Sequence, residues 1–561
     1  MISRRDVLQI GAAVAAYGFG PLRRAAAQQR ITQDELLAFD HYGNITLLHM
    51  ADLHAQLMPV YLREPSVNVG AGEARGQPPH LTGKAFLEYY AIPPRTAEAY
   101  ALSSEDFVAL AREYGRVGGL DRIATVVKAV RAERGGDRVL FLDGGDSWQG
   151  SLTANRTRGQ DMVDCLKLLA PDAMTGHWEF TYGETRLREL IDRLGAPFLA
   201  LNIRDTEWQE PVFDGYKMFE KGSVRVAVLG EAFAYTPVAN PAWMIPKWTF
   251  GIREEDVRAT VAKARKEGAQ LVVLLSHNGF DCDRKMAARV EGIDVILTSH
   301  THDALPVVTT VGKTLLVASG SDGKFISRLD LDVRGMEVAG YRYKLIPIFA
   351  DVIAPDSEMA LKIAQVRAPF ASELARVVGQ SQSLLYRRGT FNGTIDDLIC
   401  AAITSERDAE IALSPGFRWG TTILPDAPIT VEDIANATAM TYPQVYRTTM
   451  NGAQLKAVLE DIADNLFNPD PYYQQGGDMV RCGGIGYRID VNQPMGQRIS
   501  ELTRFPSGEA IDAGKDYTVA GWASVRENIE GPPVWEMVER YLARVQTVRI
   551  EPSTNVKVAG L

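Results

Sequence analysis

The feature that most constrains the fold is a short apolar run that recurs through the first part of the chain and ends each time in a polar cluster. In chain order the runs are NITLLHMADLH, RVLFLDGGD, APDAMTGHWEF, LVVLLSHNGF and DVILTSHTH. Such runs are typical of buried strands, and helical patterns such as GLDRIATVVKAVRAERGG lie between them. This alternation predicts a layered α/β domain over residues 31–350, with polar clusters at the carboxyl ends of its strands.

The remainder of the chain predicts a second, smaller α/β domain over residues 381–561. With 561 residues the chain exceeds what one ordinary core supports, so two domains are expected. Residues 351–380 are expected to form a connector helix that begins at Pro-Asp-Ser and breaks near Pro369. A long insertion rich in proline and glycine, between Leu57 and Gly118, is expected to be ordered but to lie outside the core.

The N-terminal segment predicts export through the twin-arginine pathway. Arg4 and Arg5 precede a moderately apolar stretch and the A-x-A cleavage site that ends at Ala27. We therefore expect residues 1–27 to be a signal peptide and the mature protein to be periplasmic.

The formal net charge of −10 and the lack of a basic run argue against a nucleic-acid partner. No later apolar run is long enough to predict stable membrane insertion.

Aspartates and histidines follow the predicted strands in a regular order. They are Asp52, His54, Asp146, His177, His277, His300 and His302. A lone Asp-x-His or a lone histidine is common, but the complete set at strand ends predicts a metal centre. Carboxylates and neutral imidazoles favour Mn²⁺, Fe²⁺ or Zn²⁺ over Mg²⁺ or Ca²⁺. An aspartate shared by two ions would hold them about 3.5–4 Å apart. His49, on the first strand, is expected to pack or to support a ligand.

With these motifs the chain resembles the metallophosphoesterase and 5′-nucleotidase family. The resemblance implies an N-terminal four-layer αββα metallophosphoesterase domain and a smaller C-terminal α/β domain of the 5′-nucleotidase type, which supplies substrate contacts. It implies that one metal is held by Asp52, His54, Asp146 and His302. It implies that the other is held by Asp146, His177, His277 and His300. His177 stands where nucleotidases have Asn, and His302 where many have Gln.

The segment TGHWEF departs from the nucleotidase pattern Gly-Asn-His-Glu-Phe-Asp. In that family the His stabilises the phosphoryl transition state and the Asp orients it, but Trp178 and Thr181 occupy those positions here. This departure, the insertion YLREPSVNVG…GQPPHLTG and the segment SPGFRWG resemble the SoxB family of thiosulfohydrolases. That resemblance implies a dimanganese centre, with Zn²⁺ or Fe²⁺ as alternatives. It also implies a protein-borne substrate, a cysteine S-thiosulfonate on the SoxY subunit of the SoxYZ carrier.

The implied reaction releases sulfate and leaves a persulfide on the carrier. A persulfide is a more acidic leaving group than an alkoxide, so the missing His–Asp pair would be tolerable. Trp178 is expected to form a wall of the site, with simple packing as the alternative. Arg418, in SPGFRWG, is expected to bind the sulfonate, with a salt bridge as the alternative. The expected catalytic residues are Asp146, His177, Trp178 and Arg418, and Arg481 is a further candidate for substrate contact.

Two other functions remain open at this point. One is a periplasmic 5′-nucleotidase or related phosphoesterase, against which Trp178 and Thr181 argue. The other is a non-catalytic metal-bound interaction protein, against which the complete set of metal ligands argues.

Overall fold

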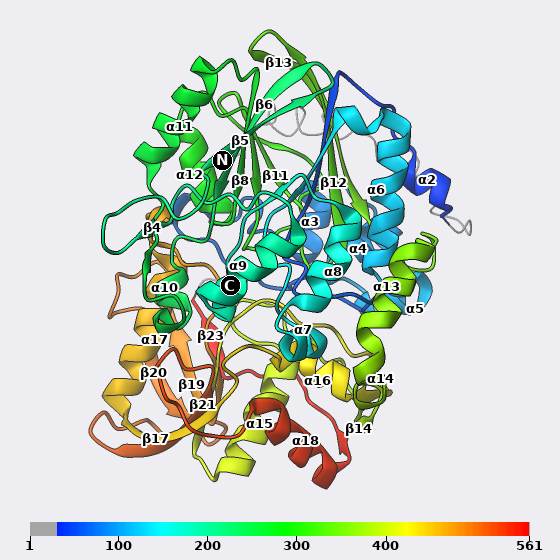
Figure 1. Cartoon of the computed structure of the whole chain (residues 1–561). Helices are drawn as coiled ribbons and strands as arrows, with labels where there is room; N and C mark the ends of the chain where they lie inside the picture. Colours follow the sequence, from blue (N-terminus) through cyan, green and yellow to red (C-terminus); the bar gives the residue numbers. More distant parts are fainter. Residues whose placement is uncertain (1–30, 560–561) are drawn as a thin grey trace. The chain divides into compact units, whose positions relative to one another are not determined.

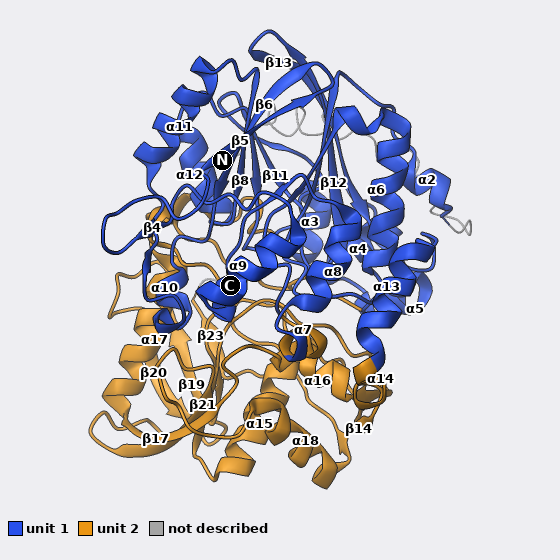
Figure 2. Ribbon diagram, in the orientation of Figure 1, with its two compact units in different colours: residues 1–60, 82–149, 156–368 blue, residues 61–81, 150–155, 369–561 orange. Residues whose placement is uncertain are grey.

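The computed structural model describes residues 31–559, which form two compact units (Figure 2). Of the described residues, unit 1 comprises 31–60, 82–149 and 156–368, and unit 2 comprises 61–81, 150–155 and 369–559. The predicted signal peptide lies outside the described residues. Of the helices within residues 31–559, none combines the length and apolar character needed to cross a bilayer.

Unit 1 is built on two sheets, one of five and one of six strands. The first has the order β13-β12-β1-β2-β3, with β1 (Ile45–Met50), β2 (Val139–Asp143), β3 (Ala173–Met174), β12 (Phe325–Arg334) and β13 (Glu337–Pro347). The second has the order β10-β11-β9-β8-β6-β5, with β5 (Tyr216–Lys221), β6 (Val224–Glu231), β8 (Leu271–Ser276), β9 (Val295–Thr298), β10 (Thr309–Val311) and β11 (Thr314–Ala318). Within each sheet the central strands are parallel, so their carboxyl ends share one edge.

Helices cover the outer faces of both sheets and complete the four-layer αββα arrangement that the family resemblance implies (Figure 1). One helical layer contains α6 (Leu120–Arg134), α8 (Gln160–Leu169) and α13 (Ser357–Arg367); the other contains α11 (Glu254–Lys266) and α12 (Phe280–Arg289). The remaining helices of unit 1 are α2 (Gln33–Leu37), α3 (Gly83–Tyr89), α4 (Ala97–Leu102), α5 (Phe107–Tyr114), α9 (Glu184–Leu194) and α10 (Thr236–Ala239). Because helices lie on one face and the partner sheet on the other, β1, β2, β8 and β9 are buried along their whole lengths.

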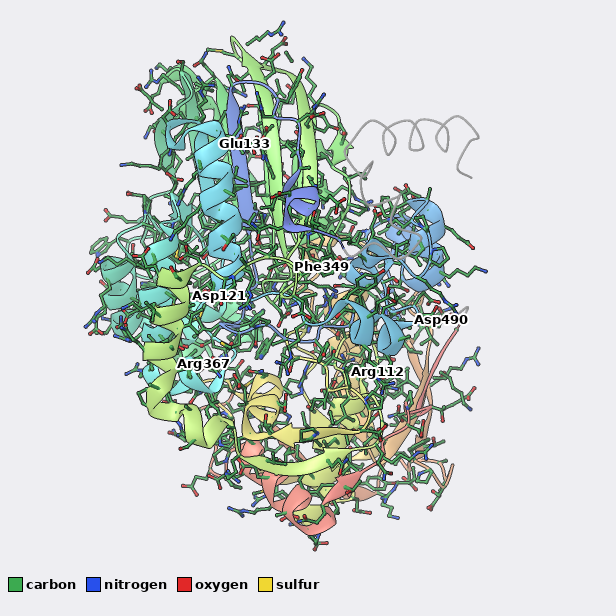
Figure 3. All side chains as sticks on the ribbon, turned by 90° about the vertical axis from the view of Figure 1, so that its right-hand side faces the viewer. Arg112, Asp121, Glu133, Phe349, Arg367 and Asp490 are labelled. Carbon is green, nitrogen blue, oxygen red and sulfur yellow. The ribbon has the colours of Figure 1, made fainter. Side chains whose placement is uncertain are left out.

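An ion pair between a buried arginine and a partly exposed glutamate joins the helical layer to the first sheet. Both guanidinium NH groups of Arg328, on β12, donate to the carboxylate of Glu133 near the end of α6, at 2.8 Å each. Figure 3 shows Glu133 at that end of the helix and Asp121 at its start. The Arg328 side chain is 1% exposed and that of Glu133 is 36% exposed, so the two-point contact anchors α6 on the sheet from its solvent side.

The connecting region agrees with the predicted helix start and break but contains more than one element. Asp356 caps α13 by accepting a hydrogen bond from the backbone of Met359, and the helix ends at Arg367, before a 3₁₀ turn that contains Pro369. Residues from Pro369 onward belong to unit 2, where α14 (Ala371–Leu374) and β14 (Val377–Ser381) follow.

Unit 2 contains three small sheets flanked by helices. The sheets have the orders β16-β14-β22, β17-β21-β15-β18 and β20-β19-β23. Their strands are β15 (Ile411–Ser414), β16 (Ala427–Thr430), β17 (Val445–Asn451), β18 (Arg481–Gly483), β19 (Ile485–Ile489), β20 (Ile499–Arg504), β21 (Asp516–Trp522), β22 (Thr547–Val548) and β23 (Val556–Val558), with β14 as above. The longer helices are α15 (Thr394–Arg407), α16 (Val431–Thr438), α17 (Gly452–Phe467) and α18 (Val534–Val545).

Part of the insertion contributes to the core of unit 2, contrary to the expectation that it would lie outside the core. Val67, Val69 and Ala71 pack against a cluster that includes Leu455 and Ile485. These apolar side chains alternate along an extended segment, so one face of it can be buried. The expected contiguous domains did not include this exchange of segments between the two parts of the chain.

One glycine controls how closely two loops of unit 1 approach. Gly145 has a φ of +90°, and a Cβ there would lie 2.8 Å from the Cα of Gly176. We therefore expect Gly145→Ala to lower the free energy of unfolding by about 2 kcal/mol or more, because it combines a left-handed backbone with overpacking. Gly136→Ala is the matched control, since its Cβ would meet open space. Urea titrations of both variants test this; equal stability of the two would contradict it.

Candidate metal centre

The seven predicted ligands meet at the carboxyl ends of strands from both sheets of unit 1. They follow β1, β2, β3, β8 and β9, and all seven are buried. They form two clusters in which the ligand atoms lie within 4.8 Å of one another. One cluster contains Asp146, His177, His277 and His300, and the other contains Asp52, His54, Asp146 and His302. Each cluster is a donor set that can hold one divalent ion, so together they can hold a metal pair.

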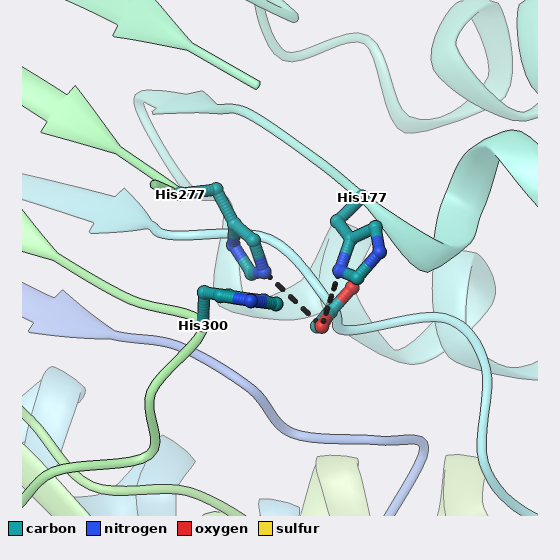
Figure 4. A group of neighbouring side chains, drawn as sticks. His177, His277 and His300 are labelled. Carbon is teal, nitrogen blue, oxygen red and sulfur yellow. Dashed lines mark ion pairs between the residues drawn. The ribbon is translucent and has the colours of Figure 1, made fainter. Parts of the chain in front are cut away.

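Asp146 belongs to both clusters, and one of its oxygens faces imidazoles of each. Its Oδ2 lies 3.1 Å from His277 Nε2, 3.3 Å from His177 Nδ1 and 3.7 Å from His54 Nε2. Figure 4 shows the rings of His177 and His277 turned toward this carboxylate. Its Oδ1 accepts a hydrogen bond from the backbone N–H of Trp178 at 2.7 Å, which holds the carboxylate in this orientation. Asp146 is therefore the residue that two ions, one in each cluster, would share.

Backbone carbonyls determine which ring nitrogen of two histidines is available. His277 Nδ1–H donates to the Gly144 carbonyl oxygen at 2.6 Å, and His54 Nδ1–H donates to the Gln149 carbonyl oxygen at 3.3 Å. The neutral form of each ring then has its lone pair on Nε2, which faces the cluster. Fixing the tautomer through the second ring nitrogen is the usual support of a metal-bound histidine.

Several nitrogen atoms of the two clusters converge with poor hydrogen-bond partners, an arrangement that fits metal ions. His177 Nδ1 and His277 Nε2 are buried and have no hydrogen-bond partner within the described chain. His54 Nε2 and His302 Nε2 lie 3.0 Å apart although both are ring nitrogens. Buried polar atoms without partners cost free energy, and a coordinated ion would remove that cost.

The loops that carry the ligands have an unusual backbone. Five of the seven ligands have a positive φ, between 45° and 76°, which is uncommon outside glycine; they are Asp52, His54, Asp146, His300 and His302. Such residues cost of order 1–3 kcal/mol each and concentrate at functional sites. The rigid sheets hold the loops in these conformations.

The metal-free site has strongly perturbed protonation equilibria. Burial raises the pKa of Asp52 well above its usual range, although His277 lowers it. Burial also acts to raise the pKa of Asp146, but His177 and His277 hold it well below its usual range. Burial lowers the pKa of His54 to about 4. For His277 burial acts downward, but Asp146 and Asp52 raise the pKa to about 10.

Glu179 organises the two loops without belonging to either cluster. Its carboxylate accepts hydrogen bonds from the backbone N–H groups of Ser147 at 2.7 Å, His177 at 2.9 Å, Asp146 at 3.3 Å and Trp148 at 3.3 Å. It is fully buried and links the loop after β2 to the loop after β3. Glu179 was not predicted as a site residue, although its position in the TGHWEF segment was an available signal.

Trp178 and Thr181 lie in the 3₁₀ turn η4 (Trp178–Tyr182), directly after His177. The Trp178 side chain is 8% exposed, and its ring centroid lies 5.5 Å from that of His177. The Thr181 hydroxyl donates to the Trp178 carbonyl oxygen at 2.7 Å, so it stabilises the turn. The place of the nucleotidase His–Asp pair is therefore taken by an indole and a hydroxyl bound to backbone.

The arginine candidates lie in unit 2 and form a network with Asp478. Arg418 Nε lies 3.2 Å from Asp478 Oδ1 and its NH2 donates to the Gly477 carbonyl oxygen at 2.8 Å. Arg481 NH2 lies 2.8 Å from the other oxygen of Asp478. The structure thus gives Arg418 a salt bridge within its own unit. A role for Arg418 in binding substrate stays a prediction.

His49 supports the first sheet and is not a ligand in either cluster. Its Nδ1–H donates to the Ser319 hydroxyl at 2.6 Å, and burial lowers its pKa to about 3. This contact agrees with the predicted role of His49 in packing or in support of a ligand.

Metal uptake should release protons. Near neutral pH His277 in the metal-free protein holds a proton, because its pKa is about 10. A metal must displace this proton, so the apparent affinity should rise with pH, about tenfold per pH unit for each proton displaced. Calorimetric titration with Mn²⁺ in buffers of different ionisation heat measures the number released. At least one proton per chain is expected near neutral pH, and release of none would contradict the assignment.

Comparisons with known proteins place the chain in a family. The family of 5′-nucleotidase C-terminal domains matches residues 377–539. The rat 5′-nucleotidase is 25% identical over 457 residues, which cover 72% of this chain and 76% of that protein. The solved 5′-nucleotidase precursor of Thermus thermophilus has the same fold, with a TM-score of 0.72, 20% identity, and coverage of 92% of this chain and 99% of that one.

The Thermus thermophilus sulfate thiohydrolase SoxB, solved in complex with glycerol, is considerably more similar. The TM-score is 0.90 and the identity 37%, over 93% of this chain and 98% of the SoxB chain. This similarity extends over both units and far exceeds that of the nucleotidases reported above. The chain therefore belongs to the SoxB sulfate thiohydrolase family, within the hydrolases of the 5′-nucleotidase and metallophosphoesterase group.

Proposed function

We propose that the protein is a dimetal thiosulfohydrolase that acts on a cysteine S-thiosulfonate of the SoxY subunit in the SoxYZ carrier and releases sulfate during thiosulfate oxidation. The observation that carries this proposal is a complete dimetal donor set beside Trp178, where a nucleotidase has its transition-state histidine. Family membership supports the same reaction class. We propose Mn²⁺ as the resident metal, twin-arginine export and a periplasmic location.

The proposed reaction balances as a hydrolysis. The oxygen of one water molecule attacks the terminal sulfone sulfur of R–S–S–SO₃⁻, and a new S–O bond forms. The S–S bond to that sulfur breaks, and its electron pair leaves with the persulfide R–S–S⁻. Sulfate is released, and the protons of the water pass to solvent. Two divalent ions held by the seven ligands would supply water acidity and neutralise sulfonate oxygens.

The side chains beside the clusters suit this leaving group. The Trp178 indole is no acid near neutral pH, and the Thr181 hydroxyl is used in the turn. This part of the site therefore supplies no proton to a departing alkoxide, which a phosphomonoester would need. A persulfide is acidic enough to leave as an anion, because lower leaving-group pKa speeds departure. The ring of Trp178 can instead contact sulfur atoms and an apolar peptide arm.

A 5′-nucleotidase activity is the alternative, favoured by the match of residues 377–539 to nucleotidase C-terminal domains.

One experiment distinguishes the two functions. The mature protein, loaded with Mn²⁺, is offered AMP and, separately, a carrier-type peptide whose cysteine bears an S-thiosulfonate. We expect sulfate release from the peptide without phosphate release from AMP. Ion chromatography measures the sulfate, and a phosphate assay measures the phosphate. Phosphate release from AMP without sulfate release from the peptide would overturn the proposal.

A matched variant tests why the two activities differ. Trp178→His with Thr181→Asp restores the nucleotidase pair, and Thr181→Asp alone is the control. The double variant should raise phosphate release from AMP about tenfold or more, because a positioned acid–base group contributes at least that much. No gain in the folded, metal-loaded double variant would show that the missing pair does not set the specificity.

A further inference from the structure

Asn240 contacts the site from a segment that none of the predicted motifs includes. It lies between α10 (Thr236–Ala239) and the turn η5 (Ala242–Met244), and its side chain is 2% exposed. Its neighbours Val238 and Trp243 are 57% and 43% exposed. The segment therefore exposes two apolar side chains to solvent and buries the polar side chain of Asn240.

The buried amide contacts the second ring nitrogen of one metal ligand. Asn240 Oδ1 lies 2.8 Å from His177 Nε2, and the contact is buried. An amide oxygen only accepts hydrogen bonds, so Nε2 carries the proton and donates it. The other nitrogen, Nδ1, is left with a lone pair, and it faces Asp146 Oδ2 at 3.3 Å.

Without this acceptor His177 would have a competing state. Its ring packs against Phe233, with centroids 4.3 Å apart, and Nε2–H donates to Asn240 Oδ1. Removing the amide oxygen leaves Nε2–H without that hydrogen bond. The imidazole proton would then move to Nδ1 and donate to the Asp146 carboxylate. A protonated Nδ1 cannot coordinate a metal, so this tautomer removes one ligand and occupies the bridging oxygen of another.

We propose that Asn240 is a positioning residue for the metal that His177 helps to hold. Its amide oxygen keeps the imidazole proton on Nε2 and so keeps Nδ1 available to the metal. The requirement arises because His177 replaces the asparagine of nucleotidases: an amide ligand has no tautomer to fix, whereas an imidazole ligand does.

The test measures Mn²⁺ binding alone, with no substrate, so it is decided independently of the proposed reaction. Asn240→Leu keeps the size of the side chain and removes the acceptor. It should weaken binding of one Mn²⁺ about 10–100-fold, the usual effect of losing such a support, and leave the other ion in place. Asn240→Asp keeps an acceptor oxygen and should retain both ions. Metal content after gel filtration and the electron paramagnetic resonance signal of a coupled Mn²⁺ pair are the readouts.

A double-mutant cycle separates positioning from a general effect on folding. In a His177→Asn background there is no tautomer to fix, so Asn240→Leu should change Mn²⁺ affinity by less than about threefold. Asn44→Ala is the control for loss of a hydrogen-bonded asparagine: Asn44 exchanges two hydrogen bonds of 2.9 Å with the backbone of Val333, ahead of the start of β1. This control should bind both ions normally.

The proposal fails in either of two cases. In the first, folded Asn240→Leu binds both ions with unchanged affinity. In the second, the loss in affinity is the same with His177 and with His177→Asn, which would make Asn240 a packing residue only.

Discussion

The site depends on one buried carboxylate. Asp146 Oδ2 faces imidazole nitrogens of both clusters, while its Oδ1 is held by the backbone of Trp178. A buried anion of this kind is stable only next to positive charge. In the metal-free protein a proton on His277 supplies that charge, and in the loaded protein the metal pair would. Protons and metals therefore compete for the same few atoms, and the balance between them is set by how the surrounding loops are held.

Groups that belong to neither ligand cluster hold those loops in place. Glu179 ties the loops after β2 and β3 together through four backbone N–H groups, and the carbonyl oxygens of Gly144 and Gln149 fix two imidazole tautomers. The positive φ values of the ligands cost free energy that the fully buried strands of the two sheets offset. The ligand geometry is thus a property of the whole of unit 1 and not of the ligands alone.

The apolar runs predicted the layered α/β domain, and the family resemblance supplied its αββα arrangement. The seven ligands were predicted to meet because each follows a buried strand within a few residues. Partners that do not follow a strand in a recognisable motif were not predicted. Asn240 and His177 are separated by 63 positions, and no local pattern links them. The packing of Val67 and Val69 into unit 2 was also missed, because proline and glycine dominate that segment; the alternation of its apolar residues was the usable signal.

The central claim is that Asp146 bridges two ions held by the two clusters. Anomalous diffraction from crystals of the Mn²⁺-loaded protein locates the ions directly. We expect two ions about 3.5–4 Å apart, with Asp146 between them and each ion in contact with the histidines of its own cluster. A single ion, or two ions without Asp146 between them, would contradict it.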